Sequence, residues 1–249
     1  MTDDRTRQNL FLASLSDQDL QSIEPHLRPR ILGLGEVVVE QGERLKVIHF
    51  VDTGIVSCVV PLRDGHAVEA CMIGSEGFTG LEACYHPAQS TTRLLVQAPG
   101  RSRTIDSEIF RQLVHTSDTL QAAVADYDWR LRAEIEQSTA CNAVHLAEQR
   151  LAKWLLRCHD RHDGDMMNLT QEFLATMLGT QRSTVNQVAI SMSKSGAIRY
   201  SRGKVTVKNR AVLEAAACEC YSPVMATRDR RTISDLLVGG GPDARTALS

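Results

Sequence analysis

Aromatic residues are scarce in this chain of 249 residues, at 4% of the total. Proteins that bind single-stranded nucleic acid stack bases on aromatic rings, so the composition disfavours that class. The sequence also lacks an apolar run long enough to span a bilayer, and its polar start, Met1-Thr2-Asp3-Asp4-Arg5, lacks the apolar core of a signal peptide. We therefore expect a cytoplasmic protein with no membrane partner.

The cysteines give little support to a metal centre or a disulfide framework. There are seven of them, and none precedes Cys58, which argues against an iron–sulfur cluster held by N-terminal cysteines. Cys218 and Cys220 form a tight pair, but neither a His nor a second Cys pair stands near them in the sequence. We interpret the cysteines as buried free thiols of a reducing compartment and predict no metal site.

Acidic residues are missing from Phe173 to Leu213, although the whole chain contains 30 of them. Charge is uneven as a result: residues 1–145 carry a net −7, residues 146–222 a net +4 and residues 223–249 a net +1. A polyphosphate backbone repels carboxylates and attracts Lys and Arg. Only one part of the chain is therefore suited to nucleic acid.

Two short helical patterns lie on either side of Gly179 in this region. Thr170 is the expected N-cap of the first helix, and Gly179 is expected to end it in a left-handed conformation. The second helix should begin at Thr180 or Gln181, with an apolar inner stripe of Val185, Val188, Ala189 and Met192. Two strand patterns around Arg202-Gly203 follow. The order of these elements predicts a winged helix-turn-helix.

The outer face of the second helix predicts double-stranded DNA as the partner. The N-terminal residues of a recognition helix meet base edges in the major groove, where Arg reads guanine and Asn or Gln reads adenine. The predicted base-reading residues are Arg182, Ser183, Asn186 and Gln187. The predicted phosphate-contacting residues, which position the helix without reading sequence, are Thr170, Gln171, Gln181, Thr184, Arg202 and Lys204.

The N-terminal half has the pattern of a β-sandwich or barrel. Its short β-branched runs are 36–40, 47–51, 55–60, 67–73 and 91–97. We predict turns at Asp52-Thr53-Gly54 and Asp64-Gly65. A long helix is expected from about Ser117 to about Ala143, followed by another from His145 to about His159. The spacing of Leu120, Val124, Tyr127 and Leu131 fits either dimerisation or packing on the helix's own domain.

The order of these motifs resembles the Crp/Fnr family of bacterial transcription regulators, over about Asp17 to Tyr221. The residues that carry the resemblance are Gly42-Glu43, Phe50-Val51-Asp52-Thr53-Gly54, the long helix and Gly179-Thr180-Gln181-Arg182-Ser183-Thr184-Val185. It implies an α+β fold with a cyclic-nucleotide-binding-type jelly roll, a long dimerisation helix and a C-terminal winged helix-turn-helix. It also implies a non-enzymatic homodimer on a near-palindromic site, with RNA polymerase as a further partner.

The resemblance gives each segment an expected role. The segments are 1–30, an N-terminal helical segment; 31–105, the jelly-roll sensor domain; 106–144, a helical region with the dimerisation helix; 145–221, the DNA-binding domain; and 222–249, a disordered tail. In the recognition helix, Ser183 and Gln187 replace a Glu and an Arg that are common in the family, so the preferred DNA sequence should differ.

The family's cyclic-nucleotide site does not carry over. Leu81 stands where the family's Glu is expected, and Thr92-Arg93 stands where Arg-Ser is expected. We therefore predict no cyclic nucleotide and no cofactor, while haem ligation by His49, His66 or His86, or another effector, stays open. The alternative function is a small-molecule, redox or haem sensor whose DNA-binding domain is vestigial. A jelly-roll metalloenzyme is disfavoured because no His-x-His spacing occurs.

Overall fold

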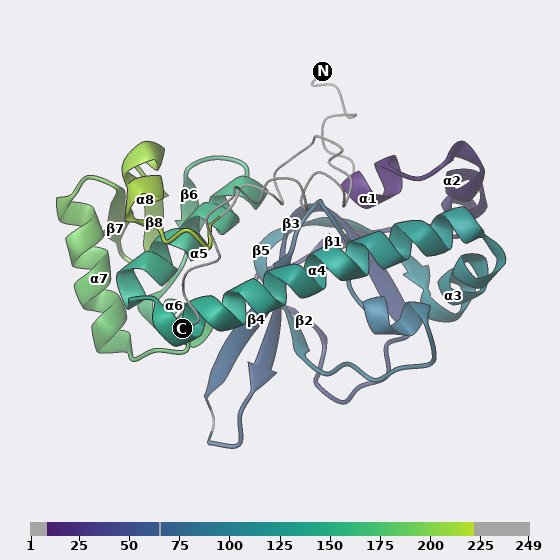
Figure 1. Cartoon of the computed structure of the whole chain (residues 1–249), viewed down its shortest axis with the longest axis horizontal. Coiled ribbons are helices and arrows are strands. Elements are labelled where there is room, and N and C mark those ends of the chain that lie inside the picture. Colours follow the sequence, from purple (N-terminus) through teal and green to yellow (C-terminus); the bar gives the residue numbers. More distant parts are fainter. Residues whose placement is uncertain (1–8, 65, 222–249) are drawn as a thin grey trace, which may run out of the picture.

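The chain, analysed as a computed structural model, is described at residues 9–64 and 66–221. The predicted disordered tail, 222–249, lies outside the described residues. Figure 1 shows a sheet-containing N-terminal domain, a long helix that runs along it, and a smaller C-terminal domain at the far end of that helix. Among the described helices, none is long and apolar enough to cross a membrane.

The N-terminal segment is helical for a shorter distance than predicted. It forms α1 (Leu10–Ala13), α2 (Asp17–Ile23) and the short η2 (Glu24–His26). Ser16 caps α2 by accepting a hydrogen bond from the Asp19 amide at 3.1 Å. Strand β1 (Arg28–Leu32) already begins within the predicted helical segment 1–30, so that boundary was placed too late.

A five-stranded antiparallel sheet forms the core of the N-terminal domain, in the order β1-β5-β3-β4 with β2 also paired to β5. Its other strands are β2 (Val37–Val39), β3 (Val47–Pro61), β4 (Ala67–Ile73) and β5 (Arg93–Asp106). The predicted hairpin at Asp64 is confirmed, since Pro61 pairs with Ala67. This sheet, with the helices and winged domain that follow it, is the predicted jelly-roll plus winged-helix architecture.

The predicted turn at Asp52-Thr53-Gly54 was wrong, because these residues lie inside the continuous strand β3. The register against β5 shifts on both sides of Thr53, and Gly54 has a φ of 90°. A Cβ on Gly100 would come within 1.9 Å of the Thr53 carbonyl oxygen. The glycines therefore permit a bulge that bends the paired strands without breaking the pairing.

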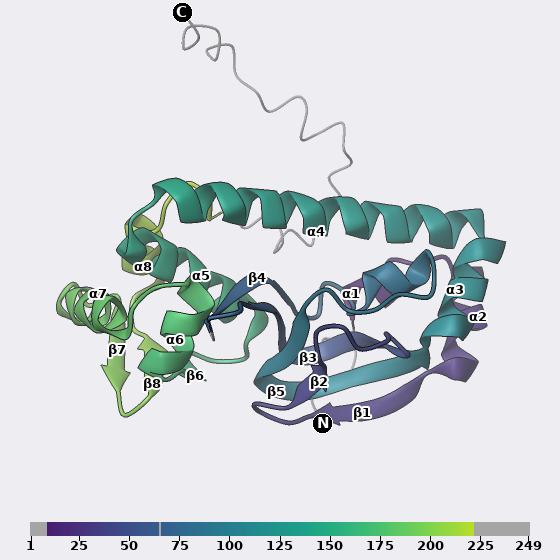
Figure 2. The same ribbon diagram turned by 90° about the horizontal axis from the view of Figure 1, so that it is seen from below.

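The long helix α4 (Asp118–Val144) follows α3 (Ser107–Thr116) and runs along one side of the sheet (Figure 2). Leu120, Val124 and Tyr127 are each at most 2% exposed. They pack with Phe11, Phe50, Phe78 and Phe110 in the core of their own domain. The heptad-like spacing of these residues fitted either dimerisation or packing on their own domain. The structure shows that they pack on their own domain.

Tyr127 ties α4 to the turn before η3 (Leu81–Cys84). Its hydroxyl donates to the Phe78 carbonyl at 2.9 Å and accepts from the Phe78 amide at 3.2 Å. A Cβ on Gly77 would come within 2.3 Å of the Tyr127 ring. The glycine thus allows the turn to approach the helix closely.

The C-terminal domain contains helices and a three-stranded sheet in the order β6-β8-β7. Its elements are α5 (Ala147–Arg161), β6 (Met166–Asn168), α6 (Gln171–Leu178), α7 (Arg182–Lys194), β7 (Ile198–Ser201), β8 (Lys204–Val207) and α8 (Arg210–Ala216). The two wing strands were predicted. Strand β6 was not, because three residues without a β-branched side chain give little strand signal.

The two domains share a hydrophobic core at the β3–β4 hairpin. Ile55, Val59 and Met72 of the sheet pack with buried residues of the C-terminal domain. The Trp154 indole donates to the buried Glu69 carboxylate at 2.8 Å. Burial raises the pKa of Glu69, although Ser57, Arg157 and Trp154 oppose that rise. The contact places the helix-turn-helix at a defined position relative to the five-stranded sheet.

Candidate nucleic-acid interface

The helix-turn-helix is built from local signals that the sequence carries. The Thr170 hydroxyl accepts a hydrogen bond from the Phe173 amide at 3.1 Å and so caps α6. Gly179 ends that helix in the left-handed conformation, with a φ of 56°. Gln181 then stands as the N-cap of α7. Glycine suits position 179 for two reasons: it adopts the left-handed conformation, and it leaves room for Val68 of the five-stranded sheet, which packs directly against it.

The outer and inner faces of α7 divide as expected for a recognition helix. Val185, Ala189 and Met192 are buried against the rest of the domain. The four predicted base-reading residues are all exposed: Arg182, Ser183, Asn186 and Gln187. They lie in the first half of the helix, where a major groove would receive them.

Gln171 of α6 lies between two of these residues. Its amide nitrogen donates to the Asn186 side-chain oxygen at 2.8 Å, and its oxygen accepts from the Arg182 guanidinium at 3.4 Å. The bridge orients Arg182 and Asn186 relative to each other before any ligand arrives. Sequence reasoning placed Gln171 among phosphate contacts and did not find this bridge, since the partners lie 11 and 15 residues away on another helix.

Tyr200 of β7 is a further residue at this surface that the sequence pattern did not single out. It is half-buried on the wing. Burial raises the pKa of its hydroxyl, while its contacts with Gln171 and Arg182 act in the opposite direction. Its phenol therefore stays protonated near neutral pH and can donate a hydrogen bond.

The candidate phosphate-contacting residues lie near the ends of these elements. Gln181 is exposed and Thr184 half-buried at the start of α7. Arg202 and Lys204 are exposed at the wing turn, where Arg202 and Gly203 both have positive φ. The Leu169 amide donates to the Gly203 carbonyl at 2.8 Å, so the wing turn lies beside Thr170 at the start of α6. The structure thus brings the candidates Arg202 and Lys204 of the wing turn close to the candidate Thr170 of α6.

The candidate effector residues of the N-terminal domain lie on separate elements. Glu82 points to solvent from η3, and Arg93 pairs with Glu40 at 2.7 Å. Of the three candidate haem ligands, His66 and His86 are exposed. His49 is buried, with its Nδ1 atom 3.4 Å from the Ser102 hydroxyl. Burial, with the neighbouring Arg30 cation, lowers the pKa of His49 to about 4.

The structure brings together four side chains that lie far apart in the sequence. Cys218 and Cys220 have a His and another Cys near them in space, because folding brings His145 and Cys141 to the same place. The two pairs are separated by more than 70 residues of chain, so sequence spacing could not reveal the group.

Comparison with known protein families identifies the type of the C-terminal domain. Residues 149–216 match a family model described as a Crp-like helix-turn-helix domain. The C-terminal domain is therefore a DNA-binding domain of that type. A comparison with curated proteins finds no match.

The whole fold is similar to that of solved regulators. A transcriptional regulator of the CRP family from Thermus thermophilus is 18% identical, with a TM-score of 0.65, covering 78% of this chain and 98% of its own. The c-di-GMP responsive global regulator CLP of Xanthomonas campestris is 15% identical, with a TM-score of 0.62, covering 78% and 100%. FixK2 of Bradyrhizobium japonicum is 18% identical, with a TM-score of 0.60, covering 77% and 98%.

The chain therefore contains a Crp-like helix-turn-helix domain, and its fold is similar to that of solved regulators of the Crp/Fnr type. The sequence resemblance is confirmed by both comparisons.

Proposed function

We propose that the chain is a sequence-specific regulator that binds double-stranded DNA as a homodimer and contacts RNA polymerase there. The observation that carries the proposal is the exposed face of α7, on which Arg182, Ser183, Asn186 and Gln187 stand in a segment without a single acidic residue. Such a face can enter the major groove without repelling phosphate.

The two kinds of contact have separate roles in this proposal. Arg182 and Gln187 read base edges through paired hydrogen bonds, and Gln171 keeps Arg182 and Asn186 in position. Arg202 and Lys204 at the wing turn hold phosphates and supply charge. The Thr170 hydroxyl accepts from the backbone, which leaves its own proton free to be donated to a phosphate.

The second copy is expected on the outer face of α4. Because Leu120, Val124 and Tyr127 face inward, the exposed residues that repeat at 7-4-7 spacing lie on the opposite side: Ala122, Trp129, Ala133 and Ala140. Trp129 is 41% exposed and Val144, near the helix end, is 74% exposed. Small residues beside one large aromatic side chain suit the close approach of an identical helix. The helix is about 40 Å long, which offers a long dimer interface.

We propose further that the sensor domain does not bind a cyclic nucleotide and needs no resident cofactor. The guanidinium that would meet a phosphate, Arg93, is already paired with Glu40. His49 is neutral and enclosed by its own domain, which disfavours it as a haem ligand.

Footprinting of the full chain on DNA upstream of its own coding sequence tests the function. We expect protection of two half-sites whose centres are about one helical turn, or about 10–10.5 base pairs, apart or a multiple of that. Equal affinity for that DNA and for a scrambled fragment would contradict sequence-specific binding. It would favour instead a sensor that signals through a protein partner.

A further inference from the structure

Four metal-ligating side chains converge where α4 ends and the C-terminal domain closes. Cys141 lies in the last turn of α4 and His145 directly follows that helix, whereas Cys218 and Cys220 follow α8. One ligand atom from each of the four lies within 4.8 Å of the others. We propose that this Cys3His group binds one tetrahedral Zn²⁺ ion, at a site distinct from the DNA-binding surface.

The distances between the ligand atoms fit a site for a single metal ion. Zn–S and Zn–N bonds of about 2.3 and 2.0–2.1 Å, at tetrahedral angles, place two sulfur ligands about 3.8 Å apart and a sulfur and a nitrogen about 3.6 Å apart. The Cys141 and Cys218 sulfurs are 3.6 Å apart, and the Cys220 sulfur is 3.5 Å from His145 Nδ1. Thiolate and imidazole ligands in this number favour zinc among common metals.

Neighbouring side chains orient the ligands. The Glu219 carboxylate lies 3.2 Å from His145 Nε2, so that this nitrogen carries the proton and Nδ1 is left to face the thiols. The Gln137 amide donates to the Cys220 sulfur at 3.0 Å. The buried ammonium of Lys153 attracts the Cys141 sulfur. Three thiolates around a divalent ion leave one negative charge, which Lys153 offsets.

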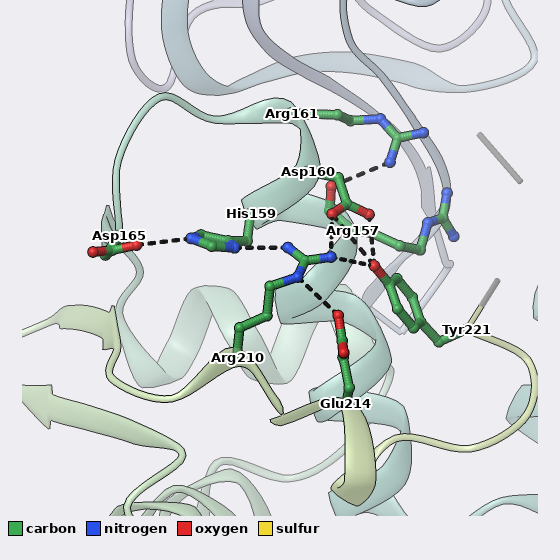
Figure 3. A network of polar contacts seen from close by, with 8 residues as sticks. All are labelled: Arg157, His159, Asp160, Arg161, Asp165, Arg210, Glu214 and Tyr221. Carbon is green, nitrogen blue, oxygen red and sulfur yellow. Dashed lines mark hydrogen bonds and ion pairs between the residues drawn. The ribbon is translucent and has the colours of Figure 1, made fainter. Parts of the chain in front are cut away.

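The segment that carries Cys218 and Cys220 is anchored independently of any metal. The Arg210 guanidinium donates to the Tyr221 hydroxyl at 2.6 Å and to Asp160 at 2.7 Å, and the Tyr221 hydroxyl donates to Asp160 at 3.0 Å (Figure 3). This network joins the chain after α8 to α5. The segment that carries the two cysteine ligands is therefore held in place against α5 before a metal binds.

A bound ion would fasten the end of α4 to the DNA-binding domain. Two ligands come from the end of the long helix, and two come from the last described turn of the C-terminal domain. Crosslinking these elements restricts rotation of the domain about the junction between α4 and α5.

The test measures metal in the full chain, purified in its reduced form. We expect about one zinc per chain, and on replacement by Co²⁺ a thiolate-to-cobalt charge-transfer band. Cys220→Ser should lower the intensity of the band, because one thiolate is lost, and His145→Gln should change the d–d absorption of the bound cobalt. Each variant should raise the zinc dissociation constant by more than the 10–100-fold typical of losing an outer-shell partner. Cys220 is half-exposed, so its replacement leaves the hydrophobic core intact and the variant should fold.

A matched control distinguishes this site from other thiols. Cys84→Ala removes a buried cysteine of the N-terminal domain and should keep the zinc content and the cobalt band. Equal zinc content and equal cobalt spectra in the unmodified chain and Cys220→Ser would overturn the proposal. So would a Cys141–Cys218 disulfide in the anaerobically purified chain together with failure to take up Zn²⁺ after reduction.

Discussion

Arg182 is an exposed residue at the start of α7, and its guanidinium donates a hydrogen bond to Gln171. Arg182→Ala should reduce discrimination between the footprinted site and scrambled DNA by about 10- to 100-fold, because a bidentate base contact contributes about 1–3 kcal/mol. The ratio of the two dissociation constants measures this. Arg199→Ala, which removes an exposed charge from β7, is the control and should preserve the ratio. An unchanged ratio in Arg182→Ala would show that Arg182 does not contribute to recognition of the base sequence.

Lys204 at the wing turn should contribute charge without sequence preference. Lys204→Ala is expected to weaken binding to specific and scrambled DNA alike. It should also reduce the slope of log K against log salt concentration by about 0.9, the value for one lost phosphate contact. Titrations over a range of salt concentrations measure the slope. A loss confined to the specific site would contradict a phosphate contact.

His49 should make stability depend on pH. Its pKa is about 4 in the folded chain because of burial and the Arg30 cation, against an ordinary value of 6.5. The unfolded chain therefore binds an extra proton as pH falls from 6.5 to 4, and the free energy of unfolding should fall by on the order of 3 kcal/mol across that window. Urea unfolding at several pH values measures this. His49→Gln should weaken the pH dependence of the free energy of unfolding, whereas a substitution of the exposed His66 should leave that dependence unchanged. The same pH dependence in His49→Gln as in the unmodified chain would show that His49 is not its source.

At the scale of elements, the contact between α4 and the turn at Phe78 depends on one hydroxyl. Tyr127→Phe leaves the buried Phe78 amide and carbonyl without their side-chain partner. We expect a loss of about 1–3 kcal/mol in the free energy of unfolding, measured by urea denaturation. Tyr85→Phe is the matched control, because its hydroxyl bonds the Asp128 carboxylate at the surface and should matter little. Equal losses in the free energy of unfolding for the two variants would contradict this role of the Tyr127 hydroxyl.

At the scale of the whole molecule, dimerisation should depend on the outer face of α4. Ala133 is exposed near the middle of that face. Ala133→Arg would bring two like charges and two long side chains into the helix pair, and we expect a monomer by sedimentation or light scattering. Gln121→Arg, on an exposed position outside the 7-4-7 stripe, should stay dimeric. A monomeric unmodified chain would contradict the proposed interface.

Local signals in the sequence account for most of the C-terminal domain and for the element order. Thr170 caps a helix, Gly179 ends it and Arg202-Gly203 forms a turn because each depends on backbone chemistry within a few residues. The acid-free segment and the exposed face of α7 follow from composition and helical period alone. These features could be predicted without knowledge of the rest of the chain.

Contacts between distant residues required the folded structure. The periodicity of Leu120, Val124 and Tyr127 is the same for an inward seam and for a dimer seam, and only the neighbouring core decided for the former. The bulge at Gly54 depends on the approach of Gly100, and the Gln171 bridge depends on the angle between two helices. The group formed by Cys141, His145, Cys218 and Cys220 arises because the last turn of one domain lies against the end of α4. Sequence spacing does not reveal such contacts, because they result from packing between elements and not from the local backbone.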